Sequence, residues 1–591
     1  VCSSDLISDL GGDFNGGTWE DGTVYYESVP NDALEKVLWM ESDRMGFFIN
    51  TVSEKGLECE KDVVINEKRQ MYDNRQYGHT SSVIRKALYP SGHPYSWTVI
   101  GESSDIRRAT LDDAREFYRE WYNPNNATIS ISGDFDSDEV LSLVKKYFGE
   151  IKSDSHKKQK NIVDIPVLTK EIRLVHEDKF ANLPELTMVF PAPQQYSRDS
   201  YALSFLCELL AVGKDSPLYK AIVEKNLAPE VAMNVFSKEI CGEIHLRIRA
   251  FSDIKLDDVY SAIKCAFDDF EKKNISAIEM ERIRKALEIA VYQEYTSNMD
   301  VAINMAESNV FGGSPDSILR ELEIIESITI EEVLCAYNKY VKNKPFVATS
   351  FVPLGHVDLA LDGSERAEVV EEDVLTQENP IDEGAVDDES YEFSASSFDR
   401  SVEPELGVLS PLKMPDIWTS KLANGIEIHG AYRGGLPLVL FTFYIKVGSA
   451  HCPMDKLGVA YITAKMLKCG TKNKSAEELE NAFRNFGTDL HINISKERIS
   501  YNLLCVNRDF AELLQLVNEV LTQPRWDEKE FDKLKRETLS LIEVSLSNPQ
   551  KLGIKEFEKA VLGDIPLAYP VEGIKDTVEN LTLDDVRDFY D

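Results

Sequence analysis

The sequence has little that points to a membrane, to nucleic acid or to a disulfide framework. None of its apolar runs, over 591 residues, reaches the length of a membrane-spanning helix. It holds 65 Lys and Arg against 102 Asp and Glu, a net charge of −37, and no basic patch stands out, which disfavours phosphate binding. Its nine cysteines form no Cys-x-x-Cys pair. We expect reduced, packed thiols at the positions with apolar neighbours: Cys207, Cys241, Cys265, Cys335 and Cys505.

The sequence does contain an internal repeat. TLDDAREFY at Thr110–Tyr118 returns as TLDDVRDFY at Thr582–Tyr590, with seven of nine positions identical. Further back, LGGDF at residues 10–14 faces FGTDL at residues 486–490, and the register drifts by only four residues between the two matches. Similarity of this length and order indicates an internal duplication of a large domain rather than a short solenoid repeat.

The duplication predicts that the chain is a piece of a longer protein. The second copy begins near Pro415 and its Phe483 faces Ile7, so about 68 residues of the second copy have no counterpart in the first. Asp591 falls inside a helix that, in the first copy, leads on to further structure, and we expect truncation at both ends. Residues 1–6, VCSSDL, match the translation of a string that resembles the end of a sequencing adapter, which suggests an authentic start near Ile7.

Hydrophobic periodicity predicts an α+β fold in which helices cover mostly antiparallel sheets. The expected domains are residues 1–155, 156–355 and 413–591, the last being the repeat of the first. Residues 356–412 read as a flexible linker, because 356–405 holds 17 acidic residues, two arginines and no lysine. The expected strands are 23–29, 126–136, 186–193, 243–251 and 436–447, and the expected helices are 32–48, 53–77, 199–212, 256–272 and 278–295.

The second of these helices carries two carboxylates on what looks like its apolar face. Val63, Val64 and Met71 mark that stripe, and Glu60 and Glu67 fall on it, seven residues apart. A buried carboxylate is costly unless it is paired or bound to a metal, although charged helix faces are usually just solvated. Aligned on Asn74 and Asn548, Glu67 faces Leu541 in the second copy. We therefore expect the position to be buried in both copies, with a use for charge only in the first.

Four segments resemble one known family in order: LGGDFNGGTWEDGTVYYESVP, EKDVVINEKRQMYDN, HPYSWTVIG and NPNNATISISGDF. They are similar to the N-terminal half of the insulinase/pitrilysin metallopeptidases, relatives of the mitochondrial processing peptidases. That resemblance implies duplicated peptidase domains forming the two halves of a clamshell, which close around an unfolded peptide. It also implies zinc, held by an inverted His-x-x-Glu-His on one helix and a distant Glu on a second.

Only part of that zinc site matches this chain. Glu67 corresponds to the distant third ligand, and Glu60 to a carboxylate that supports a ligand histidine. The His-x-x-Glu-His is absent, and in the second copy YITAK, Tyr461–Lys465, stands in its place, so that half should be free of zinc. By the repeat, the motif of the first copy would begin about 22 residues before Ile7, as Tyr461 precedes Phe483. His93, His451 and His491 belong to no such motif.

The resemblance also assigns a substrate strand. Asn15, Gly16, Gly17 and Thr18 match the edge strand that pairs with a peptide in the family, and two glycines would let a peptide backbone approach closely. The alternative is that these residues form a turn leading into the strand at Thr23. The two interpretations weigh about equally on sequence.

The sequence therefore predicts a zinc endopeptidase as the full-length parent, with this chain inactive alone because two ligands and the base are missing. The alternatives are a non-catalytic scaffold or assembly member of the same fold, and an acidic peptide-binding module. The expected partners are a peptide substrate and the other half of the clamshell, without nucleic acid or a membrane span. Family members act as monomers, dimers and heterodimers, and the compartment stays open between periplasm and cytoplasm.

Overall fold

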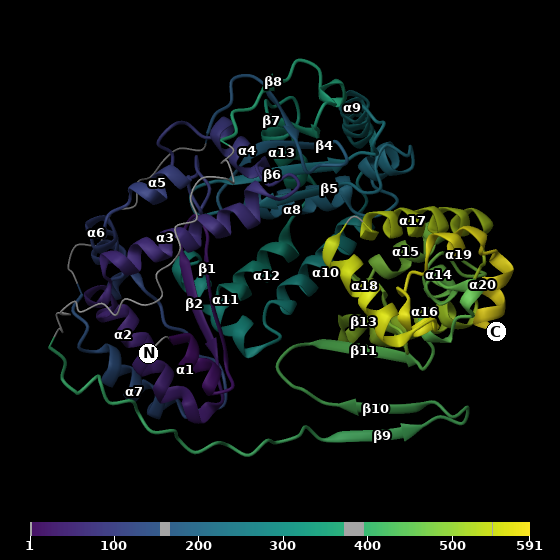
Figure 1. Cartoon of the computed structure of the whole chain (residues 1–591). Coiled ribbons are helices and arrows are strands. Elements are labelled where there is room, and N and C mark those ends of the chain that lie inside the picture. Colours follow the sequence, from purple (N-terminus) through teal and green to yellow (C-terminus); the bar gives the residue numbers. More distant parts are fainter. Residues whose placement is uncertain (1–2, 154–165, 371–394, 547) are drawn as a thin grey trace. The chain divides into compact units, whose positions relative to one another are not determined.

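The computed structural model describes residues 3–153, 166–370, 395–546 and 548–591 (Figure 1). The chain forms two compact units. The first comprises Val1–Ala211, Pro217–Lys272 and Glu294–Arg433, and the second Val212–Ser216, Lys273–Gln293 and Gly434–Asp591. The domain boundary that we predicted at residue 155 lies outside the described residues, and so does the stretch 371–394 of the acidic linker.

The N-terminal part of the first unit is a hairpin surrounded by helices. Two of its helices begin at side-chain caps: the Ser53 hydroxyl accepts a hydrogen bond from Gly56 N at the start of α3, and Thr110 forms a reciprocal capping box with Asp113 at the start of α6. The elements are α1 (Ser3–Asp9), β1 (Asp13–Thr18), β2 (Thr23–Ser28), α2 (Leu34–Gly46), α3 (Glu54–Lys68), α4 (Thr80–Leu88), α5 (Ser103–Arg108), α6 (Leu111–Trp121) and α7 (Ser137–Phe148).

A six-stranded sheet follows, in the order β5-β6-β4-β7-β3-β8. Its strands run antiparallel except that β3 is parallel to β7 and to β8. The strands are β3 (Ile172–Asp178), β4 (Glu185–Ala192), β5 (Ala232–Phe236), β6 (Gly242–Arg249), β7 (Val347–Pro353) and β8 (Glu365–Arg366). The helices of this part are α8 (Arg198–Ala211), α9 (Leu256–Lys272), α11 (Asn298–Phe311), α12 (Ser317–Ser327) and α13 (Ile330–Tyr340). α10 (Ala277–Gln293) lies between α9 and α11 in the chain but is part of the second unit.

Helices cover both faces of this sheet, which is why its central strand β4 is buried almost throughout. Successive residues of a strand point to opposite faces. Val189 packs in one cluster with Ile84 and Leu88 of α4. Its neighbour Phe190 points the other way and packs at a tilt against Phe346, with 5.3 Å between ring centres, and Phe346 in turn contacts Tyr260 of α9. The sheet therefore anchors the N-terminal helices through α4.

The second unit is built on the three-stranded sheet β11-β13-β12, preceded in the chain by the separate hairpin β9–β10. The strands of this sheet are β11 (Leu438–Ile445), β12 (His491–Ile494) and β13 (Ile499–Val506). The hairpin strands β9 (Ile417–Lys421) and β10 (Glu427–Ala431) belong to the first unit by their contacts. The helices are α14 (Val459–Met466), α15 (Ala476–Arg484), α16 (Phe510–Thr522), α17 (Glu528–Leu546), α18 (Pro549–Leu562), α19 (Lys575–Asn580) and α20 (Leu583–Tyr590). By its contacts α10 belongs here, where Arg282 donates to Asp215 (3.0 Å) and to Asn481 (3.1 Å).

The two copies have the same local architecture, pair by pair. In the hairpin β1–β2, Asn15 faces Tyr26 and Thr18 faces Thr23; in β12–β13, His491 faces Asn502 and Ile494 faces Ile499, a constant shift of 476 residues. The same shift relates α2 to α16, both 13 residues long. The capping box at the start of α6 recurs at α20, between Thr582 and Asp585. The fold class predicted from the sequence, α+β with duplicated, mostly antiparallel parts, is confirmed.

Three local expectations differ from the structure. The strand predicted over 126–136 is not formed, since residues 127–132 pair with no described strand. Cys265 and Cys335 are exposed, since they lie on the solvent sides of α9 and α13, whereas the other three thiols are buried as expected. The helix predicted over 53–77 ends as an α-helix at Lys68 and continues as a π-helical turn, Arg69–Asp73.

One carboxyl pair inside the N-terminal part makes stability depend on pH. Burial, and next the carboxylate of Glu41, raise the pKa of Glu27 to about 8. The guanidinium of Arg44, which lies 3.9 Å from Glu27 and 2.9 Å from Glu41, lowers this pKa, but by less. The folded state thus binds a proton that the unfolded state, with a pKa near 4.5, releases. The stability that this proton gives is complete below pH 4.5 and is lost as pH rises toward 8.

We predict that Glu27→Gln removes this loss. Between pH 5 and 9 the free energy of unfolding of the parent chain should fall by on the order of 2 kcal/mol more than that of the variant. Urea titrations at several pH values measure both. Parallel pH profiles for the two proteins would contradict the assignment.

Candidate active site

The helix predicted to carry the metal ligand, α3, turns a different face to the protein interior than the sequence indicated. Its buried residues are Lys61, Ile65 and Lys68. Glu60 and Glu67 are exposed, and the stripe between them is open too, with Val63 50% and Met71 49% exposed. Leu541, opposite Glu67 in the second copy, is 39% exposed. The prediction that this position is buried in both copies is therefore wrong.

Two lysines explain the rotation of α3, because their aliphatic stems are buried while their ammonium groups find acceptors. Lys61 Nζ donates to Glu58 Oε1 (2.6 Å) and to the carbonyl of Arg107 at the end of α5 (3.3 Å). Lys68 Nζ binds both carboxylate oxygens of Asp73, at 2.9 and 3.1 Å. Lys61, Ile65 and Lys68 have the spacing of one helix face, but two of the three are charged, so a search for apolar residues did not identify this face as the buried one.

The second repeat shows what normally covers the opposite face. Lys535 of α17 repeats the bond of Lys61, donating to the carbonyl of Leu581 at 2.9 Å, so the two helices have the same orientation. Leu534, the counterpart of Glu60, packs with Tyr461 of α14 against one core cluster. Phe589 of α20 packs there as well, whereas its counterpart Phe117 on α6 is 59% exposed. Among the described residues, no helix like α14 covers α3 and α6.

The described residues do not make a zinc site. No three His, Cys, Asp or Glu side chains within the described ranges lie close enough together to hold a metal ion. Glu60 and Glu67 share one exposed helix face, which supplies carboxylate oxygen only, whereas catalytic zinc sites combine three protein ligands that usually include histidine. The structure places the two carboxylates on one face of α3.

The proposed substrate residues form a strand. Asn15, Gly16, Gly17 and Thr18 lie in β1, and the chain turns only at residues 19–22, so the alternative of a turn at these four positions is wrong. Asn15 Oδ1 accepts a hydrogen bond from Gly16 N (2.8 Å). A Cβ at Gly16 or Gly17 would meet only ordinary contacts, 3.4 Å and 3.7 Å away, so the fold itself does not require glycine there. Among the described strands β1 pairs only with β2, which leaves its other edge open.

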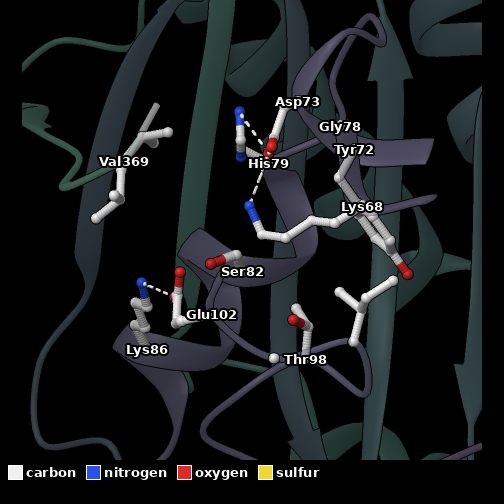
Figure 2. Close-up of a pocket in the computed structure, with 13 residues that line it drawn as sticks. Lys68, Tyr72, Asp73, Gly78, His79, Ser82, Lys86, Thr98, Glu102 and Val369 are labelled. Atoms are coloured by element: carbon white, nitrogen blue, oxygen red, sulfur yellow. Dashed lines mark hydrogen bonds and ion pairs between the residues drawn. The ribbon is translucent and has the colours of Figure 1, made fainter. Parts of the chain in front are cut away.

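A polar pocket lies on the buried side of α3, away from Glu60 and Glu67 (Figure 2). Its cavity volume is about 20 Å³, and α3, α4 and the loop before α5 line it. Figure 2 shows that its charges are paired: Lys68 with Asp73, which His79 also approaches at 3.9 Å, and Lys86 with Glu102 at 2.7 Å. Because each ammonium already faces a carboxylate, the pocket offers no uncompensated charge to a ligand.

His93 lies in the packed interior. It is 2% exposed, it stacks on Tyr89 with 4.6 Å between ring centres, and its Nδ1 accepts from Tyr95 N (3.0 Å). Burial, and next Lys238, lower its pKa, so the ring is neutral at physiological pH.

Comparison with known proteins decides the family. The model described as "Peptidase M16 inactive domain" matches residues 108–287, and the model described as "Insulinase (Peptidase family M16)" matches residues 438–574; together they cover more than half of the chain. The chain belongs to the insulinase family, peptidase family M16. The peptidase model thus matches the second repeat, which contains the segment YITAK, Tyr461–Lys465.

The relatives of this M16 chain include named proteases. It is 26% identical to "Zinc protease PqqE" of Helicobacter pylori over 304 residues, 50% of this chain and 67% of the relative. It is 23% identical to a mitochondrial presequence protease of Xenopus laevis over 513 residues, 80% of this chain and 48% of the relative. The chain spans about half to two thirds of the length of these curated relatives.

Solved structures agree on the fold. The crystal structure of a protease from Helicobacter pylori matches with a TM-score of 0.54 and 23% identity, covering 59% of this chain and 84% of that one. A peptidase M16 inactive domain from Pseudomonas fluorescens matches with a TM-score of 0.51 and 16% identity, covering 62% and 84%. No described helix is long and apolar enough to cross a membrane.

The opposite faces of α3 predict opposite responses to substitution. Lys61→Ala removes a buried stem and leaves the Arg107 carbonyl without its donor, so it should lower the free energy of unfolding by about 1–3 kcal/mol. Glu67→Gln changes an exposed side chain and should alter stability by less than about 0.5 kcal/mol. Chemical denaturation of both variants measures this, and a Glu67→Gln loss as large as that of Lys61→Ala would contradict the orientation of α3.

Proposed function

We propose that this chain is part of a zinc endopeptidase that cleaves peptides or unfolded protein segments, and that α3 carries one of its metal ligands, Glu67. Glu60, two turns away on the same face, supports a ligand histidine. The two histidines and the general base come from a segment that is not among the described residues. Bound zinc would activate water for attack on the scissile carbonyl.

One observation carries this proposal: the face of α3 that holds both carboxylates is uncovered, while the same face of α17 is covered by α14. A helix that packs on α3 as α14 packs on α17 would place its own residues beside Glu60 and Glu67. In α14 the matching positions hold Tyr461 and Lys465, neither of which is a zinc ligand of the family. A helix in that position with histidines in place of Tyr461 and Lys465 would give the two carboxylates a metal to hold.

The open edge of β1 supports a peptide as the substrate. An extended peptide that adds to a strand edge gains backbone hydrogen bonds regardless of its sequence, which suits an endopeptidase with several substrates. Gly16 and Gly17 carry no side chain that would keep the peptide backbone at a distance. The presequence protease and the zinc protease among the relatives also support a peptide substrate.

A non-catalytic scaffold remains the second candidate, because the second repeat shows that this architecture persists without zinc ligands. The two proposals differ in the segment upstream of Ile7. A His-x-x-Glu-His encoded about 22 residues before Ile7 at the source locus would support the peptidase, and a degenerate motif such as YITAK would support the scaffold. Reading that stretch of the locus is the direct test.

The activity test uses the chain extended upstream through the missing motif. We predict zinc binding and chelator-sensitive hydrolysis of an unfolded peptide, both reduced at least a hundredfold by Glu67→Gln. Asp62→Asn, an exposed carboxylate of the same helix that lies off the Glu60–Glu67 face, is the matched control and should change neither. Full activity of the Glu67→Gln protein would overturn the assignment.

The 591-residue chain by itself should be inactive. With one carboxylate ligand in place, we predict no stoichiometric zinc after dialysis and no chelator-sensitive peptide hydrolysis. Metal analysis and a fluorogenic peptide assay check this. Hydrolysis that a chelator abolishes would show that the described residues contain a site which the present assignment misses.

A further inference from the structure

The acidic linker contains a segment that is bound to the N-terminal part of the first unit through one buried arginine. Arg400 is one of only two basic residues in the stretch 356–405. Its Nη2 donates to Glu150 Oε1 (2.7 Å) and to the carbonyl of Tyr147 (3.0 Å), and its Nη1 donates to the hydroxyl of Ser42 (3.0 Å). The side chain is 11% exposed, which is unusual for an arginine in a linker.

Aromatic rings enclose the same guanidinium. Its central carbon lies 4.0 Å from the ring centre of Phe47, at the end of α2, and 4.6 Å from that of Phe398, in the linker itself. Phe398 also meets Tyr147 of α7 edge-to-face, with 5.3 Å between ring centres. Arg400 therefore occupies a site formed by α2 and α7 that fits a planar cation.

Backbone and side-chain bonds continue this docking on both sides of Arg400. The hydroxyl of Ser396 and the amide of Ser397 donate to the Glu150 carboxylate at 2.6 and 2.5 Å. These bonds and Arg400 outweigh partial burial and lower the pKa of Glu150 to about 2, so the pair stays ionised at physiological pH. Further along, the Trp39 indole donates to the carbonyl of Arg400 (3.2 Å).

The C-terminal end of the docked segment binds the residues just before α2. The amide of Gly407 donates to the carbonyl of Asp32 (2.8 Å), and Asn31 exchanges two bonds with Ser410, one to the hydroxyl (2.7 Å) and one from the amide (3.2 Å). In Figure 1 this part of the chain is the green segment that passes α7 and α2 before β9. All of these contacts lie within the first unit.

We propose that residues 396–410 form a clasp, a segment recognised by the surface of α2 and α7, which shortens the free chain that leads to the second repeat. With the clasp bound, six residues, 411–416, separate the anchored chain from β9, a reach of about 20 Å when fully extended. Upstream of the clasp, the last described residue with a backbone hydrogen bond is Ala367, whose amide donates to the carbonyl of Val175 at 2.8 Å. The sequence from residue 368 to residue 416 has a contour length of about 165 Å, which is the upper limit of the tether once the clasp is released.

This difference matters because tether length sets how often two linked parts meet. The effective concentration of one part near the other falls roughly as the −3/2 power of the length of a flexible tether. The clasp therefore acts as a conformational device: when it is bound it shortens the tether that leads to the second repeat, and when it is released it lengthens that tether. The device works without zinc and does not depend on the proposed peptidase activity.

The test compares Arg400→Ala with Arg366→Ala in the 591-residue chain. Arg366 is the other arginine of the linker, and its side chain is 85% exposed. By hydrogen exchange, we expect the amides of Ser397, Gly407 and Ser410 to exchange at least tenfold faster in Arg400→Ala, and to be unchanged in Arg366→Ala. Amides of β4 and β6 report global stability and should be unaffected in both. Unchanged protection of the three clasp amides in Arg400→Ala would overturn the proposal.

A second measurement keeps the proposal testable if Arg400→Ala also loosens the rest of the chain. The Arg400→Ala chain keeps Glu150 and the rest of the docking site but lacks the arginine that fills it. A labelled synthetic peptide of residues 396–410 should therefore bind this variant at least tenfold more tightly than it binds the parent chain, whose own Arg400 occupies the site. The same peptide with Arg400→Ala should not bind either protein. Equal binding of the peptide to parent and variant, or an unchanged radius of gyration by solution scattering on release of the clasp, would contradict it.

Discussion

The rotation of α3 about its own axis is the constraint on which the candidate site depends. Lys61 is held by the carbonyl of Arg107 and Lys68 by the carboxylate of Asp73, so these two side chains must face inward. Seven residues are two turns of a helix, and the face that carries Glu60 and Glu67 then necessarily faces outward. The same inward lysine, Lys68, supplies one of the ion pairs that fill the polar pocket. On one side of α3 the lysines of the pocket are paired with carboxylates, and on the other side Glu60 and Glu67 are exposed.

The large features of the fold could be predicted from the sequence because they rest on long periodic patterns. The strands β4, β6 and β11 and the helices α8, α9 and α10 were located within two residues or so, since apolar alternation and helical spacing are strong over that length. The repeat was visible for the same reason. Its equal hairpin registers could not be predicted, because register depends on pairing between residues and the two hairpins share few identical side chains.

The site was harder to predict because single side chains decide it. A search for apolar residues on α3 found Val63 and Met71, which are half exposed, and passed over Lys61, whose stem is buried. Whether a lysine is buried depends on an acceptor from a distant part of the chain, here a carbonyl 46 residues away. The strand Asn15–Thr18 was one of two alternatives for the same reason. The substrate role of that strand and the metal role of Glu67 stay predictions.

The two repeats differ in length at two joints only, and this has a practical consequence. Residues 47–53 connect α2 to α3, whereas the shorter stretch 523–527 connects α16 to α17. The second difference lies between α3 and α5. Everywhere else that the two copies can be compared, the spacing of elements is preserved, so duplication and divergence have already sampled insertions at these joints without loss of the architecture. They are the natural positions for an inserted epitope, a fluorescent reporter or a new chain terminus.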